Sequence, residues 1–216
     1  MGEALDRLPI FPLPGAVLLP HALVPLHIFE PRYRRLVQDC NAGNKLFALA
    51  NIPDDEAAGA RPPRVLPVIG LGVLASLDPL PDGRFNILVR GLRRARILEE
   101  LRSDLPYRLV RAGPLDADPG ENDSPPVRRA ADSLRRVILA LCSARPGAET
   151  AALARLAADA ADPADLADVV AGAVLQSPRE RQRVLEAVHL EERLALVSQS
   201  TADILAHSPP PASARN

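Results

Sequence analysis

The chain has 216 residues, of which 47% are hydrophobic and 25% are charged. This composition is ordinary for a globular protein that buries a core, and the length suits one large domain or two small ones. The formal net charge is −1, so the chain lacks the overall basic field that attracts nucleic acid or anionic lipid. We therefore expect a globular protein that does not rely on its net charge to find a partner.

The cysteine pattern and the early prolines bear on compartment. Cys40 and Cys142 form neither a CxxC pair nor a Cys/His cluster, which indicates a reducing, cytoplasmic location without a zinc site. Glu3 and Asp6 stand where a signal peptide would carry basic residues, and prolines interrupt each early apolar run. We therefore expect no signal peptide and no membrane span.

The first half of the chain is rich in Pro, Val, Leu and Ile and predicts short strands around one helix. Four residues starting at Tyr33 have apolar spacing i, i+3, i+4 and i+7, which predicts a helix over residues 31–41 that Gly43 ends. Gly70 and Gly72 indicate a bend or bulge inside one strand, and residues 53–63 predict a mobile loop. Strands are expected over residues 9–13, 23–29, 46–52, 65–77, 84–90, 92–98 and 107–112. This pattern favours a small, partly closed antiparallel barrel.

The second half is rich in Ala, Leu, Arg and Asp and predicts helices. An apolar stripe runs from Val127 to Leu141, a second helix starts at Asp162, and Ser177 opens a third with a capping box. A last helix is expected over residues 190–205, and the polar connection over residues 116–126 is interpreted as a linker or exposed loop. The predicted division is a β lobe at residues 1–118, a helical lobe at residues 119–206 and a disordered tail at residues 207–216.

Three segments carry a resemblance to a known family. Residues 8–35, LPIFPLPGAVLLPHALVPLHIFEPRYRR, hold two proline-punctuated apolar runs and the start of a helix. Residues 82–97 hold a glycine turn and a basic-apolar strand, and residues 177–194 hold a helical run with a glutamine and a leucine pair. These segments resemble the Lon substrate-binding domain, the N-terminal module of Lon proteases, and in particular its stand-alone bacterial members. The resemblance covers about residues 8–200 and implies an α+β fold, a PUA-like β-barrel with one inserted helix followed by a C-terminal α-helical bundle.

The resemblance implies a non-catalytic module that binds peptides or unfolded protein segments, with a role in protein quality control. Its expected partners are client proteins and an ATP-dependent protease, with no membrane and no nucleic acid. The chain lacks a GxxxxGK[ST] phosphate loop, and its single lysine, Lys45, has neither the glycine spacing nor the Ser/Thr of one. We therefore expect no enzyme activity, no cofactor and no metal from this chain.

The candidate peptide-binding residues lie where the second strand meets the first helix: His27, Phe29, Arg32, Tyr33 and Arg35. This junction places apolar strand residues beside a basic helix start, so an extended segment could bury side chains there while charges orient it. The alternative for His27 is a half-buried ring bonded to backbone, and for the arginines a solvated helix face. Phe29 and Phe47 are the aromatic candidates for an exposed anchor.

Two other functions remain open at this stage. The first is an RNA-binding PUA-like module, for which Arg90, Arg93, Arg94 and Arg96 form the densest basic run. Strand alternation would put Arg94 and Arg96 on one face and Arg93 on the other, and aromatics make up only 3% of the chain, which favours a solvated strand face. The second is an uncharacterised hydrolase that uses a cleft between the lobes, which would require convergent polar groups with perturbed pKa values.

Overall fold

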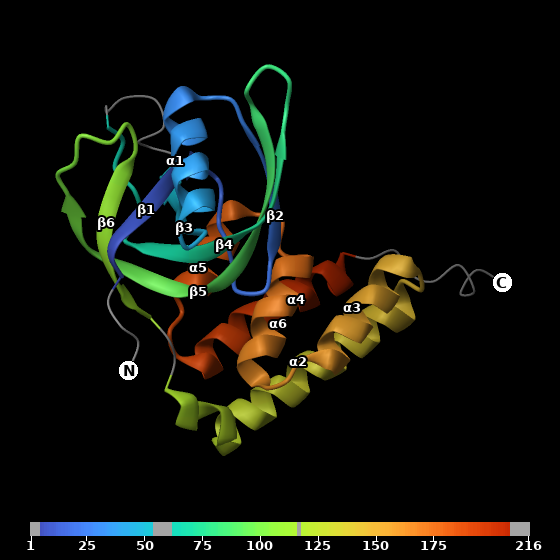
Figure 1. Ribbon diagram of the computed structural model, residues 1–216. Helices are drawn as coiled ribbons and strands as arrows, with labels where there is room; N and C mark the ends of the chain where they lie inside the picture. The colour runs from blue at the N-terminus through green and yellow to red at the C-terminus, as the bar shows by residue number, and fades with distance from the viewer. Residues whose placement is uncertain (1–4, 54–61, 116–117, 208–216) are drawn as a thin grey trace. The chain divides into compact units, whose positions relative to one another are not determined.

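The computed structural model describes residues 5–53, 62–115 and 118–207, and it divides into two compact units (Figure 1). The first unit, Met1–Asp116, contains the strands and one helix; the second, Ala117–Asn216, is helical. Strands therefore occur before residue 115 and, apart from α1, the α-helices occur after residue 124, which makes this an α+β fold. The predicted disordered tail and mobile loop fall largely on residues outside those described.

The first unit is one six-stranded sheet with one helix. Its strand order is β2-β5-β4-β3-β1-β6, and the strands predicted over residues 84–90 and 92–98 are a single long strand, β5. The elements are β1 (Leu5–Pro14), β2 (Leu23–Ile28), α1 (Pro31–Ala42), β3 (Leu46–Ile52), β4 (Val68–Pro79), β5 (Phe85–Leu101) and β6 (Arg108–Pro114).

The sheet is mixed, so the prediction of an all-antiparallel sheet is wrong in this respect. β1 and β3 pair in parallel, with Ile10 opposite Ala48, whereas the other pairs are antiparallel. Parallel strands need a long crossover, and the connection between β1 and β3 supplies one because it contains both β2 and α1. The last part of β5 also pairs with β6, so the pairing runs from β5 through β4, β3, β1 and β6 back to β5.

Helix α1 packs its predicted face onto the sheet. Tyr33, Leu36, Val37 and Cys40 are all buried, in one cluster with Phe11 of β1 and residues of β3, β4 and β5. Burial of a side chain such as Leu36 stabilises the fold by about 1.5–3 kcal/mol. Gly43 ends the helix as predicted, and its N–H donates to the carbonyl oxygens of Asp39 and Cys40.

A second cluster lies among the strands themselves. Every strand of the β5-β4-β3-β1-β6 circuit contributes to it, and many of its members are small. The buried members are Leu8, Ile10, Ala48, Ala50, Ile69, Leu71, Ala95, Val110 and Ala112. The circuit is therefore filled by side chains from all five of its strands.

Three glycines allow the chain to cross over its own sheet. A Cβ on Gly70 would collide with the backbone carbonyl of Leu18, and a Cβ on Gly91 would collide with the carbonyl oxygen of Leu19. A Cβ on Gly72 would stand 2.6 Å from a methyl carbon of Leu18. The predicted bulge exists, since the β4–β5 register shifts between Leu71 and Gly72, but the close backbone approach is the reason for glycine.

The second unit is a bundle in which α2 packs along α6, α4 packs on α6, and α3 packs against α2 and α4 (Figure 1). Its elements are η1 (Pro119–Asp123), α2 (Pro125–Ala144), α3 (Ala148–Asp159), α4 (Pro163–Val174), α5 (Pro178–Glu186) and α6 (Leu190–Ala206). Helix α3 was not predicted, because Gly147 at its start provides no side-chain cap and only Leu153 and Ala157 are buried. In the described part of the chain no helix has the length and apolarity to cross a membrane.

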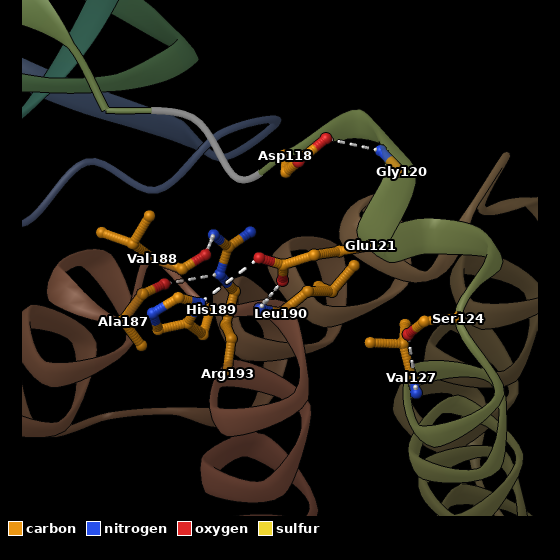
Figure 2. Close-up of polar contacts among 10 residues, drawn as sticks. All are labelled: Asp118, Gly120, Glu121, Ser124, Val127, Ala187, Val188, His189, Leu190 and Arg193. Carbon is orange, nitrogen blue, oxygen red and sulfur yellow. Dashed lines mark hydrogen bonds and ion pairs between the residues drawn. The ribbon is translucent and has the colours of Figure 1, made fainter.

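The described part of the polar connection, residues 118–126, is more ordered than the predicted linker. Its Asp118 Oδ1 accepts a hydrogen bond from the Gly120 N–H at 2.9 Å, and Ser124 caps α2 (Figure 2). Glu121 accepts the Leu190 N–H at 2.8 Å and lies 3.3 Å from His189 Nδ1. The Leu190 N–H lies in the first turn of α6 and has no partner within the helix, so the Glu121 carboxylate of η1 satisfies it. This contact fixes η1 against α6 and explains why this polar stretch is structured.

One buried arginine joins three segments of this unit. Arg193 of α6 is 2% exposed, and it donates to the carbonyl oxygens of Ala187 at 3.0 Å and Val188 at 3.2 Å (Figure 2). Its Nη1 lies 3.6 Å from the carboxylate of Asp168, which is buried in α4. Arg193 therefore holds the corner between α5 and α6 against α4.

Candidate functional site

Among the described strands, β2 is the one that pairs on a single side, with β5. Its side chains alternate, so that Ile28 is buried and Val24 and Leu26 pack against the core, while Leu23, Pro25 and His27 are exposed. Phe29 follows the strand and is 60% exposed, close to the 58% of Leu23. We call Leu23, Pro25, His27 and Phe29 the β2 face. It presents two large apolar side chains to solvent.

Side chains of β5 extend this face. In the antiparallel register, Leu23 lies opposite Arg90, Pro25 opposite Leu88 and His27 opposite Asn86. Directly opposite residues share a face of the sheet, and both Arg90 and Asn86 are exposed. The surface is therefore mixed, with an apolar row on β2 beside a polar and basic row on β5.

His27 is exposed and contacts side chains, in contrast to the half-buried alternative. Its Nδ1 lies 2.8 Å from Asn86 Oδ1, and its Nε2 lies 3.3 Å from Nη1 of Arg84. The ring is stacked with that of Phe29 at a centroid distance of 6.2 Å. The structure thus brings His27 and Phe29 together and fixes the histidine ring from β5.

Tyr33 belongs to the core. It is 5% exposed, its hydroxyl donates to the carbonyl oxygen of Pro12 at 3.1 Å, and its ring meets Phe11 edge-on at 3.9 Å. Burial raises the pKa of its hydroxyl. The Arg32 guanidinium lies 4.5 Å from the centroid of the Tyr33 ring, so the two side chains make a cation–π contact.

The two arginines of the candidate set have separate carboxylate partners. Arg32 pairs with Glu30 at 2.8 Å, and Arg35 pairs with Asp39 one helical turn away at 2.9 Å. The Tyr107 hydroxyl also donates to Asp39 at 2.9 Å. The hydrogen bond from Arg35 is the largest cause of the lowered pKa of Asp39, while burial raises the pKa of Tyr107 to about 12. The geometry therefore joins His27 to Phe29 and Arg32 to Tyr33, with Arg35 in a different ion-pair network.

Three residues of this surface were not among the peptide-binding candidates predicted from the sequence: Leu23 at the start of β2, and Asn86 and Arg90 on β5. Leu23 had a usable signal, because it occupies the same strand face as Pro25 and His27 at a spacing of two residues. Asn86 and Arg90 had none without the pairing register of β2 and β5.

The basic run keeps the predicted alternation in its strand register, because Arg93, Arg94 and Arg96 pair with Leu71, Gly70 and Val68 of β4 without a shift between them. Arg94 is 4% exposed, whereas Arg96 is exposed and Arg93 is half-buried. The register shift at Leu92 lies before this run, so Arg94 and Arg96 share a strand face and differ only in how far that face is covered.

Few aromatics are available for stacking. Phe29 is exposed, and Phe47, the other anchor candidate, is 1% exposed. The remaining aromatics, Phe11, Tyr33, Phe85 and Tyr107, are buried. A nucleic-acid surface that stacks bases on successive aromatic rings is therefore not formed.

A pocket in the first unit has a volume of about 350 Å³ and is lined in part by Asp39, Cys40 and Tyr107. Burial raises the pKa of the Cys40 thiol to about 12, so it is protonated and a poor nucleophile near neutral pH. Asp39 is an ionised carboxylate engaged by Arg35 and Tyr107, with its pKa lowered. These groups give no activated nucleophile or tuned base of the kind a hydrolase uses. Among the described residues, no cluster of three or more His, Cys, Asp or Glu is arranged to hold a metal ion.

The fold combines a mixed six-stranded sheet, whose strand β2 exposes apolar side chains, with a helical unit. The family description that matches is the ATP-dependent protease La (LON) substrate-binding domain, over residues 7–202. Since this match spans most of the chain, the chain belongs to the Lon substrate-binding domain family.

Curated relatives agree with this assignment. Lon protease 2 of Bdellovibrio bacteriovorus is 26% identical over 204 residues, which covers 93% of this chain and 25% of that protein. Lon protease 1 of Herpetosiphon aurantiacus is 32% identical over 108 residues, 48% of this chain and 13% of that protein. The chain thus spans a quarter or less of the length of these relatives.

Two solved structures share the fold. The N-terminal domain of Mycobacterium avium complex Lon protease has a TM-score of 0.72 at 20% identity and covers 92% of this chain and 99% of that one. The Lon N-terminal domain protein from Xanthomonas campestris has a TM-score of 0.57 at 23% identity and covers 95% of this chain and 100% of that one.

Proposed function

We propose that this chain binds peptides and unfolded protein segments through the β2 face. The observation that carries the proposal is the exposure of Leu23 at 58% and Phe29 at 60% on a strand that pairs on one side. Large apolar side chains gathered on one surface are typical of interaction sites. Complete burial of a leucine or phenylalanine stabilises by about 1.5–3 kcal/mol, so two half-exposed anchors can hold a client segment.

Side-chain contact is favoured over strand addition as the mode of binding. A client strand paired with the free edge of β2 would need donors along that edge, and Pro25 in the middle of β2 has no N–H. Proline is also a residue that natural sheets place on edge strands to discourage pairing. We therefore expect client side chains to cover Leu23 and Phe29.

The other candidate residues have supporting roles in this proposal. Arg32 supplies positive charge next to Phe29, and Tyr33 holds Arg32 from the core without touching the client. Arg35 contributes charge further along α1, where Asp39 holds it.

The wider setting is also part of the proposal. The circuit of five strands, each contributing to one internal cluster, supports a small PUA-like barrel as the description of the first unit. The Lon proteases among the relatives support a role in protein quality control beside an ATP-dependent protease. Cys40 and Cys142 are free thiols, which supports a reducing cytoplasmic location.

The proposal is tested by truncating the two anchors against a matched control. Leu23→Ala and Phe29→Ala should each weaken binding of fluorescently labelled casein about tenfold, measured by anisotropy. Leu139→Ala provides the control, because Leu139 is 62% exposed but lies on α2 in the other unit. All three variants should melt close to the parent, since truncation of an exposed side chain leaves no cavity. Equal binding by the parent and both β2-face variants would show that clients bind elsewhere.

A further inference from the structure

Arg90 has no carboxylate partner among the described residues, whereas Arg32 and Arg84 near the other end of the β2 face each have one. Arg32 pairs with Glu30, and Arg84 pairs with Asp82 while contacting His27. Arg90 is exposed, and its cross-strand neighbours are apolar on both sides, Leu23 on β2 and Val73 on β4. In the part of the chain that the structure describes, no carboxylate pairs with it.

The charges are also distributed unevenly along the face. The Phe29 end carries the carboxylates of Glu30 and Asp82, and Asp78 of β4 lies opposite Asn86 in the same row. The Leu23 end carries Arg90 in a locally apolar setting. The Arg90 guanidinium is therefore available to a negatively charged ligand at the Leu23 end, whereas Arg32 and Arg84 at the other end already pair with Glu30 and Asp82.

We infer that the β2 face selects apolar client segments that carry an aspartate or glutamate beside their anchor residues, and that Arg90 pairs with that carboxylate. The inference rests on the proposed function and adds a charge preference and a polarity to it. The guanidinium suits the role because its donors match both oxygens of a carboxylate. Leu23 lies directly opposite Arg90. One client segment can therefore place its apolar residue on Leu23 and its neighbouring acidic residue beside Arg90.

The test uses the full chain and three peptides that share one apolar segment and end in Glu, Gln or Lys, with both termini blocked. An exposed ion pair is weak, so the Glu peptide should bind about two- to fivefold more tightly than the Gln peptide at low salt, and the Lys peptide more weakly than either. About 0.5 M salt should remove the difference by screening. Equal affinity for the Glu and Gln peptides at low salt would overturn the inference.

Variants assign the preference to one residue. Arg90→Gln should bind the Glu and Gln peptides equally while it keeps the parent's affinity for the Gln peptide. Arg96→Gln is the control, because Arg96 is also exposed on β5 but lies opposite Val68, away from β2. A preference that persists in Arg90→Gln would overturn the role of Arg90 while the proposed function stands. Failure of all three peptides to bind would overturn the inference and the proposed function together.

Discussion

Replacement of Arg193 by methionine should destabilise the helical unit strongly. Arg193 is 2% exposed, and methionine retains much of its aliphatic volume but removes the guanidinium. That guanidinium donates to the carbonyl oxygens of Ala187 at 3.0 Å and Val188 at 3.2 Å. Asp168, at 4% exposure, would lose the cation that stands 3.6 Å from its carboxylate. The cost of a buried carboxylate that loses its ion-pair partner exceeds that of a lost surface contact.

The magnitude follows from the burial of both partners. Removal of one member of a buried ion pair costs about 3–5 kcal/mol in the free energy of unfolding. A second change, Asp168→Leu, removes the buried carboxylate, so the double variant should recover at least about 1 kcal/mol of the loss. Recovery should remain incomplete, because the carbonyl oxygens of Ala187 and Val188 still lose their donor at about 1 kcal/mol or more each.

Urea unfolding followed by helical circular dichroism measures these differences. Arg135→Met is the control, because Arg135 is 43% exposed and pairs with Asp132 on the surface of α2, where the expected cost is under about 1 kcal/mol. A loss below about 1 kcal/mol for Arg193→Met would refute the reasoning, since that is the cost of an exposed pair. Losses that simply add in the double variant would also contradict it, because coupled partners are not additive.

Three further predictions concern the first unit. Gly91→Ala should lower the free energy of unfolding by about 3 kcal/mol or more, because the added Cβ would collide with Leu19. Gly113→Ala is the control, because its added Cβ has its nearest contact at 3.4 Å. In the same denaturant titration it should stay within about 1 kcal/mol of the parent. The double change Arg32→Ala and Arg35→Ala should melt like the parent and bind casein about two- to fivefold more weakly, and unchanged affinity would remove both arginines from the client surface. The pKa of Asp39 is lowered mainly by the hydrogen bond from Arg35, so its contribution to stability is present above about pH 4 and is lost as the pH falls through the lowered pKa. Asp39→Asn should therefore be less stable than the parent at neutral pH and should approach it in acid, and a thermal-melt difference that does not change with pH would contradict this.

Local patterns predicted most elements, because their signals lie within a few residues. The period that starts at Tyr33 predicted α1, and the capping pattern at Ser177 predicted α5, where the serine hydroxyl accepts the Glu180 N–H. The parallel pairing of β1 with β3 was not predictable in this way, since it depends on how a long connection folds back.

The candidate site shows the same limit. Residue type marked His27 and Phe29 as surface candidates, and both are exposed. Residue type also marked Tyr33, but its ring points into the core, because the apolar period of α1 that predicted the helix includes it. The partners from β5, such as Arg90, depend on the register between strands that are far apart in the sequence.

The crossing of the chain over Gly70 and Gly91 makes the unit sensitive to strand register. The backbone of Gly91 also bonds to the crossing segment, donating to the Ala22 carbonyl at 2.9 Å and accepting from His21 at 3.1 Å. A slip of β5 by two residues, the smallest that keeps its faces, would place Val89 or Arg93 beneath Leu19. Their side chains would exclude the crossing segment, so it can dock only on a correctly paired hairpin. The crossing segment therefore fits only the correctly paired strands, and β2, which follows it directly, depends on the same alignment.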